Sequence, residues 1–293
     1  MFKIYVWGFY IMVIIATDSA ADFEMNELEK MNVTCLPMSI SFGDQTYLEN
    51  ISISKEEFFE KLQSDENFPK TSQPSPGAFE ELFESAKNNN DEVIYIPLSS
   101  ALSGDYQSAM AVKNMVDYDG IYILDSYTCT GGQRLLVEKA VQLKDEGKTA
   151  KEIYDFLDEL KKRVEIYTVM DTLEYLYKNG RIANTAYYIA VLGHIKPIMH
   201  AGYSTQGKAD IPSKHIGLNK AINSIIDTLK QQKPDLDYPI YVMYTYKKDN
   251  ANKLAAKIRE LGYEIPEENI VPVGATVGAH IGLNACAIAY VRQ

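Results

Sequence analysis

Short apolar runs alternate with amphipathic stretches through the first half of the chain. The runs have the length and composition of buried strands and cover residues 13–16, 33–42, 93–98 and 121–124. The stretches between them carry apolar residues at helical spacing, as at Phe79, Phe83 and Ala86. This alternation is typical of βαβ crossovers around a largely parallel sheet.

Polar residues mark where three of these helices begin. Ser54 with Glu57, and Thr149 with Glu152, have the spacing of a capping box. Ser75 precedes a proline, the arrangement of an N-cap followed by the first helical residue. The helices are therefore predicted to start at residues 55, 76 and 150.

The second half of the chain has a more mixed pattern. Strands are predicted at 164–169, 195–199, 240–245 and 285–291, and helices at 214–230 and 249–261. We expect two α/β domains, an N-terminal one over residues 12–163 with a mostly parallel sheet and a C-terminal one over 164–293 with a mixed sheet.

Residues 1–16 are apolar apart from Lys3. The segment has the character of a signal-peptide core, but cleavage after Ala16 would remove the first predicted strand. It is also too short to span a membrane comfortably. We interpret residues 1–11 as an extension upstream of the fold, such as a misassigned start before Met12 would produce.

Composition narrows the function classes. The net charge of −11 argues against a nucleic acid as partner and against electrostatic docking to anionic membranes. The hydrophobic content of 46% is enough for a real core. The three cysteines are far apart and form no disulfide or zinc pattern, which fits a reducing cytosol.

Two segments rich in hydroxyl groups are the clearest candidates for a binding site. Ser99, Ser100 and Ser103 follow a predicted strand and precede a helix, and Thr71 and Ser72 precede another helix. Free N–H groups and the positive end of the helix dipole favour an anion at such a turn. The simpler interpretation is that these side chains only cap helices. A ligand is expected beyond the carboxyl ends of the strands, where residues 17–19, 99–100 and 125–126 all fall.

Other motifs are absent or weak. The chain has no dinucleotide-binding glycine motif, no P-loop and no nucleophile elbow. Asp18 and Asp125 could hold magnesium, but strand-end aspartates more often bind turn amides. Lys178 and Arg181 are interpreted as a solvated turn. His280, in a glycine-rich segment, is either structural or close to a ligand.

Taken together, these segments resemble the DegV family of fatty-acid-binding proteins, the FakB-type subunits of bacterial fatty acid kinase. The matches occur in family order from about residue 12 to the C-terminus: Ile15-Ala16-Thr17-Asp18-Ser19, Thr71-Ser72-Gln73-Pro74-Ser75, Ser99-Ser100-Ala101-Leu102-Ser103-Gly104, Tyr106-Gln107-Ser108-Ala109, Asp125-Ser126, Asp171-Thr172-Leu173-Glu174-Tyr175-Leu176, Gly180-Arg181-Ile182, Ile195-Lys196-Pro197-Ile198 and the segment 278–282. Each segment is weak alone, and the ordered set is specific.

The resemblance implies a fatty acid in a tunnel between the two domains. Thr71 and Ser103 match the family residues that hold the carboxylate, and His280 matches the histidine that organises this end. Ser72, Ser99 and Ser100 would donate supporting hydrogen bonds. The last motif departs from the family pattern at Leu283, where a proline is usual. The segment 214–220 lacks the family's basic string, which leaves an arginine near the carboxylate in doubt.

The resemblance further implies a non-enzymatic cytoplasmic carrier, with a C14–C18 fatty acid as ligand and no cofactor or metal. The carrier would present the acid to a dihydroxyacetone-kinase-like subunit for phosphorylation to acyl phosphate, with transient membrane contact. Two alternatives stay open: an enzyme acting on a phosphorylated small molecule at the same turns, and a secreted lipid-binding protein.

Overall fold

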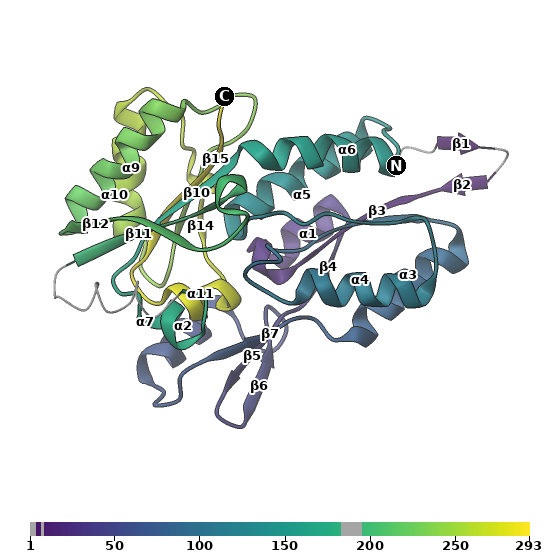
Figure 1. Ribbon diagram of the computed structural model, residues 1–293, viewed down its shortest axis with the longest axis horizontal. Helices are drawn as coiled ribbons and strands as arrows, with labels where there is room; N and C mark the ends of the chain where they lie inside the picture. The colour runs from purple at the N-terminus through teal and green to yellow at the C-terminus, as the bar shows by residue number, and fades with distance from the viewer. Residues whose placement is uncertain (1–3, 7–8, 183–194) are drawn as a thin grey trace.

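The computed structural model describes residues 4–6, 9–182 and 195–293. Two main sheets lie side by side with helices on their faces, and a small third sheet lies below them in Figure 1. The predicted fold class is confirmed, since the first sheet is parallel and the second is mixed.

The N-terminal sheet has the strand order β4-β3-β8-β9. Its strands are β3 (Val13–Asp18), β4 (Val33–Leu36), β8 (Glu92–Ile96) and β9 (Ile121–Ile123). The helices of this domain are α1 (Met25–Met31), α3 (Pro76–Asn89), α4 (Asp105–Val116), α5 (Thr130–Asp145) and α6 (Ala150–Leu160).

Strand β8 is apolar from Val93 to Ile96, because helices cover both faces of the sheet. Val93 and Tyr95 belong to the cluster formed with α3 and α4. Ile94 and Ile96 belong to the cluster formed with α5 and α6. The continuous apolar run therefore belongs to a strand that is buried on both faces, and the predicted buried strand is confirmed.

The predicted strand over 33–42 is wrong, because the run divides into two strands of different sheets. It breaks at Pro37, which has no N–H to donate and restricts the residue before it. After the break the chain enters a small antiparallel sheet of order β6-β5-β7. This sheet consists of β5 (Ser39–Phe42), β6 (Gln45–Leu48) and β7 (Lys70–Ser72), with α2 (Lys55–Ser64) in the same subdomain.

The C-terminal sheet has the order β12-β11-β10-β15-β13-β14. Among the described strands of this sheet, β13 and β14 are parallel neighbours and the other pairs are antiparallel. The strands are β10 (Val164–Val169), β11 (Ile195–Gly202), β12 (Asp210–Ile216), β13 (Tyr241–Tyr244), β14 (Ile270–Pro272) and β15 (Cys286–Val291). The helices are α7 (Glu174–Lys178), α9 (Leu218–Gln232), α10 (Asp249–Glu260) and α11 (Ala275–Ile281).

The predicted helix over 214–230 is wrong at its start. Residues 214–216 complete β12, and Gly217 turns the chain with a φ of +85° before α9 begins. A left-handed φ at this position suits glycine and interrupts a helix that composition alone would allow.

The remaining elements are short. The 3-10 turns are η1 (Ser19–Ala21), η2 (Lys161–Arg163), η3 (Tyr203–Thr205) and η4 (Glu267–Asn269). Near the N-terminus, β1 (Ile4–Val6) and β2 (Phe9–Ile11) pair as a hairpin that projects to the right in Figure 1. Among the described residues, no helix combines the length and apolar character needed to cross a membrane.

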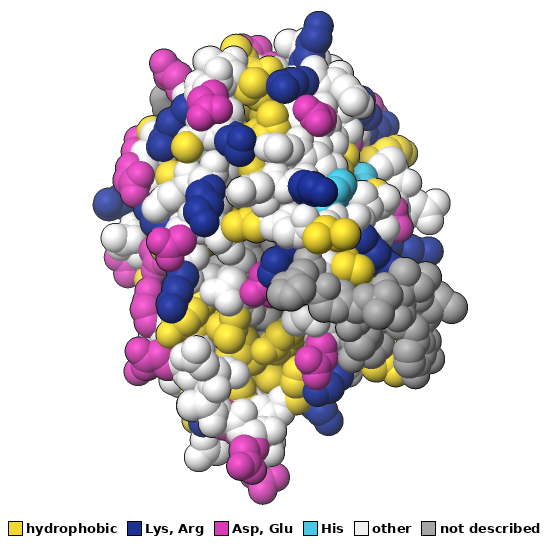
Figure 2. All heavy atoms as spheres, turned by 90° about the vertical axis from the view of Figure 1, so that its left-hand side faces the viewer, with side chains coloured by type: hydrophobic (Ala, Val, Ile, Leu, Met, Phe, Trp, Pro, Cys, Tyr) yellow, Lys and Arg dark blue, Asp and Glu magenta, His cyan; other side chains and the backbone are white. Residues whose placement is uncertain are grey.

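The distribution of charged side chains on one face of the molecule indicates whether a nucleic acid could bind there. Figure 2 shows acidic and basic side chains interspersed over the side of the molecule that lies to the left in Figure 1. A nucleic-acid backbone is usually bound along a continuous basic stripe. The charge distribution on this face therefore agrees with the argument from net charge.

The three predicted helix starts are confirmed. In the first, Ser54 Oγ accepts a hydrogen bond from the Glu57 N–H at 3.2 Å, and the Glu57 carboxylate accepts one from the Ser54 N–H at 2.9 Å. Thr149 and Glu152 repeat this box at α6. Ser75 Oγ accepts from the Ala78 N–H at 3.2 Å at the start of α3.

Removing the cap of α2 should lower stability. Ser54→Ala deletes the acceptor for an otherwise unpaired N–H, and the free energy of unfolding should fall by ~1 kcal/mol in denaturant titrations. Ser64→Ala in the same helix is the matched control, since that exposed hydroxyl only donates to the Glu60 carbonyl. Equal losses in the two variants would show that the capping contact does not stabilise the helix.

Candidate functional site

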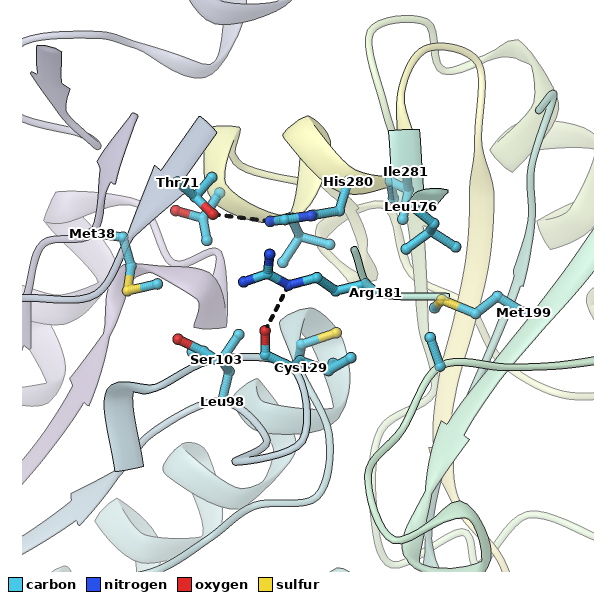
Figure 3. Close-up of a pocket in the computed structure, with 14 residues that line it drawn as sticks. Met38, Thr71, Leu98, Ser103, Cys129, Leu176, Arg181, Met199, His280 and Ile281 are labelled. Atoms are coloured by element: carbon cyan, nitrogen blue, oxygen red, sulfur yellow. Dashed lines mark hydrogen bonds between the residues drawn. The ribbon is translucent and has the colours of Figure 1, made fainter. Parts of the chain in front are cut away.

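A pocket lies between the two domains. Its walls come from the loops beyond the N-terminal strands, from β7, and from β11, α7 and α11 (Figure 3). Most of the lining is apolar. The residues are Met38, Thr71, Leu98, Leu102, Ser103, Cys129, Leu176, Arg181, Met199, Ala209, Thr276, Val277, His280 and Ile281.

The polar side chains gather toward one end of this pocket. Figure 3 shows Thr71 and His280 on one side of the Arg181 guanidinium and Ser103 on the other, with Met199 farther along the cavity. Thr71 Oγ1 lies 2.9 Å from His280 Nε2, which joins β7 to α11. Three of the six predicted site residues, Thr71, Ser103 and His280, therefore line one pocket.

His280 is a neutral imidazole at neutral pH. Burial, and secondly the positive charge of Arg181, lower the pKa of His280 to about 3. Its Nδ1 is buried and has no hydrogen-bond partner among the described residues. In the tautomer that carries its proton on Nε2, the ring would donate to Thr71 Oγ1 and leave the threonine hydroxyl proton available.

Arg181 is the site residue that sequence reasoning missed. The interpretation as a solvated turn is wrong, because the side chain is partly buried and lines the pocket. Its Nε donates to the Leu102 carbonyl at 3.0 Å, and another guanidinium N–H donates to the Asn179 carbonyl. Burial lowers the pKa of Arg181, yet a guanidinium stays charged in proteins.

No acidic side chain among the described residues forms an ion pair with Arg181. A partly buried cation without a counter-ion favours an anionic ligand, because desolvating an unpaired charge is costly. The one signal in the sequence for a role of Arg181 was its place in the segment 180–182, which matches the family pattern. Gly180 and Lys178 are exposed, and that local polarity concealed the direction of the arginine side chain.

Ser103 both supports its turn and faces the pocket. Its Oγ accepts from the Asp105 N–H at 3.3 Å near the start of α4. In the hydrogen bonds between described residues the oxygen acts only as acceptor, so its proton can be donated to a ligand. The capping and binding interpretations of this turn are therefore compatible for Ser103.

The strand-end aspartates hold turns. The Asp18 carboxylate accepts from the N–H groups of Ala20 and Leu98, both at 2.7 Å, and so fixes the turn that begins at Leu98. Asp125 Oδ1 accepts from the Ser100 N–H at 3.0 Å. Within the described ranges, no cluster of three or more histidine, cysteine, aspartate or glutamate side chains has an arrangement suited to a metal.

The other three predicted residues lie outside the pocket lining. Ser72 is exposed on β7. Ser99 is buried, and its Oγ donates to the Gly207 carbonyl at 2.9 Å. That bond fastens a turn of the N-terminal domain to the loop after β11. Ser100 contributes its backbone N–H to the Asp125 contact.

Known proteins with this fold include binders of fatty acids. A DegV domain-containing protein of Caldanaerobacter subterraneus subsp. tengcongensis is 32% identical, over 94% of this chain and 97% of its own length. A stearic-acid-binding protein from Eubacterium ventriosum superposes with a TM-score of 0.86 at 27% identity, covering 96% of this chain and 98% of its own.

Bacillus subtilis DegV, described as a fatty acid binding protein, gives a TM-score of 0.81 at 26% identity, covering 97% of this chain and all of its own. The family model described as an uncharacterised protein of the DegV family matches residues 12–293. Relatives that are 30% identical or more match this chain over nearly their whole lengths. With the profile match covering everything from Met12 onward, this chain belongs to the DegV family.

Proposed function

We propose that this protein binds one long-chain fatty acid, with the alkyl chain in the apolar pocket and the carboxylate among Thr71, Ser103, His280 and Arg181. The observation that carries the proposal is the convergence of these four side chains at one end of a mostly apolar cavity. Relatives described as fatty-acid-binding proteins support it.

Burial of the alkyl chain would supply most of the affinity. Each buried methylene contributes ~0.8 kcal/mol. A chain with about fourteen methylenes would gain on the order of 10 kcal/mol before the cost of association is subtracted. Met38 and Met199 suit such a wall, because unbranched methionine side chains adapt to an irregular apolar ligand.

The head group needs donors as well as a counter-charge. A carboxylate taken from water without partners would be destabilised by several kcal/mol. Thr71 and Ser103 would each donate one hydroxyl proton, and Arg181 would offset the charge. Hydroxyl donors hold the carboxylate without forming a covalent bond, so its oxygens stay nucleophilic.

The proposed role is to present the acid to a separate kinase subunit resembling dihydroxyacetone kinase. A carboxylate oxygen would attack the γ-phosphorus of ATP on that subunit, giving acyl phosphate and releasing ADP. This chain would hold the substrate and need no cofactor of its own. The family resemblance supports this role, and a cytoplasmic setting, which supplies ATP, fits it.

An enzyme that acts on a phosphorylated small molecule at the same turns is the alternative. The pocket wall disfavours it, because Leu98, Leu176 and Ile281 offer nothing to the hydroxyl groups of such a metabolite. A secreted lipid-binding protein would use the same pocket. That alternative depends on residues 1–15, and the position of the mature N-terminus would decide it.

The purified protein should carry C14–C18 fatty acid at close to one molecule per chain. Organic extraction followed by mass spectrometry measures the bound acid. The delipidated chain should then bind added acid in calorimetry. Absence of binding to every C14–C18 acid tested would overturn the carrier assignment.

Removing either head-group hydroxyl should weaken binding. Loss of a hydrogen bond to a charged group costs ~1.5–3 kcal/mol. Thr71→Ala and Ser103→Ala should therefore each raise the Kd for the acid roughly 10- to 150-fold. The double variant should lose less than the sum if one water replaces both donors.

Ser54→Ala serves as the control for these two variants. It should lower stability as argued above and leave the Kd unchanged, since Ser54 caps α2 away from the pocket. Parent-like affinity in both Thr71→Ala and Ser103→Ala would place the carboxylate elsewhere.

The chain alone should transfer no phosphoryl group. Acyl phosphate, trapped as the hydroxamate, should form only when a fatty acid kinase subunit and ATP are both added. Steady ADP release from ATP by this chain alone would contradict the proposal and favour the enzyme alternative.

A further inference from the structure

Glu49 is a buried acid that joins the two sides of the pocket without lining it. It follows β6 and is only 1% exposed. Its Oε2 accepts from Ser19 Oγ at 2.6 Å and from Thr276 Oγ1 at 2.5 Å. Its Oε1 accepts from the Thr276 N–H at 2.9 Å. Three donors from segments far apart in the chain therefore meet on one carboxyl group.

The first arm of this contact reaches the wall that carries Met38. Ser19 Oγ, which donates to Glu49, also accepts from the Met38 N–H at 3.0 Å. The Glu49 N–H donates to the Met38 carbonyl at 3.0 Å. Met38 is therefore held on both sides of its backbone, and its side chain lines the pocket.

The second arm reaches His280. Thr276 lies in the first turn of α11, and His280 lies four residues later on the same helix. Residues at this spacing share a helix face, and both line the pocket. A shift of the Thr276 end of this short helix would change the position of the His280 ring relative to Thr71.

The close approach at this helix start depends on glycine. A Cβ on Gly274 would lie 2.3 Å from Glu49 Oε1 and 2.7 Å from Asp22 Oδ1. The Gly274 N–H donates to Asp22 Oδ1 at 2.9 Å. Lys55 Nζ donates to the Asp22 carbonyl at 2.9 Å and brings a positive charge to this buried cluster. The fold thus brings Glu49 close to the start of α11 at the cost of burying a carboxyl group.

We propose that Glu49 is a positioning residue for the head-group end of the pocket, fixing α11 so that His280 and Thr71 meet beside Ser103 and Arg181. This inference rests on the proposed fatty acid function. If it is correct, changing Glu49 should weaken the binding of a carboxylate and have little effect on the binding of the alkyl chain.

The test compares an acid with an alcohol of the same chain length. Kd values for hexadecanoic acid and hexadecan-1-ol are measured with the full-length parent and with Glu49→Met, which keeps the length but removes both acceptors. The acid Kd should rise about tenfold or more, as for a lost hydrogen bond to a charged group. The alcohol Kd should change less than about twofold. Glu49→Gln, which keeps an acceptor for the Thr276 N–H, should recover part of the acid affinity.

Two further variants serve as the positive and the negative control. Arg181→Gln should also reduce selectivity for the acid, because it removes the counter-charge. Asp91→Leu is the matched negative control, since this buried acid accepts from the Met12 N–H at the far end of β8 from the pocket. It should leave the ratio of the two Kd values as in the parent.

Equal loss of acid and alcohol binding in Glu49→Met would overturn the inference and leave Glu49 as a purely structural contact. Failure of the parent to bind either ligand would instead overturn the proposed function, and the inference with it. If Glu49→Met does not fold, Ser19→Ala decides the question. It removes one arm without touching the carboxyl group and should shift the ratio in the same direction, and an unchanged ratio would reject the proposal.

Discussion

The hydrogen bond between Thr71 and His280 is the contact on which the candidate site depends. It joins residues 209 positions apart, one on the small antiparallel sheet and one on α11 of the C-terminal domain. Among the described residues, neither domain alone supplies all four polar side chains of the candidate site. Ser103 comes from the N-terminal domain, and Arg181 reaches back from the segment after α7 to the Leu102 carbonyl. The relative placement of the domains is therefore a condition for bringing these four side chains together.

Electrostatics at this contact distinguishes between anions. His280 is neutral because burial and Arg181 hold its pKa near 3. Among the described residues that line the pocket, Arg181 is therefore the one with a charged side chain. A single positive charge matches a carboxylate. A phosphate monoester, with close to two negative charges at neutral pH, would be left partly uncompensated in an apolar cavity. The charge balance therefore supports the proposed fatty acid over a phosphorylated small molecule.

Local signals in the sequence predicted the fold well where the physical cause is local. Capping boxes at Ser54 and Thr149 need only four consecutive residues, and both occur as predicted. Two errors came from single residues that interrupt a favourable pattern, Pro37 and Gly217. Helix α5 escaped prediction because it begins at Thr130 with two glycines, which have poor helix propensity. Tertiary packing explains why glycine stands at the start of this helix, since a Cβ on Gly131 would lie 2.7 Å from Met243 Sδ.

The candidate site was only partly predictable, because a residue's neighbours in the chain do not reveal what it contacts. Thr71 and Ser103 stand in hydroxyl-rich segments, and the family pattern marked His280. Arg181 lies among exposed polar residues, and its direction is set by the Leu102 carbonyl of the other domain. Glu49 gives no signal at all, because its partners Ser19 and Thr276 are 30 and 227 positions away. The Asp18-Ser19 motif lies at the carboxyl end of β3, as expected, and outside the pocket lining. Its side chains act there through the backbone of Leu98 and through the carboxyl group of Glu49, so the motif shapes the walls that a ligand would touch.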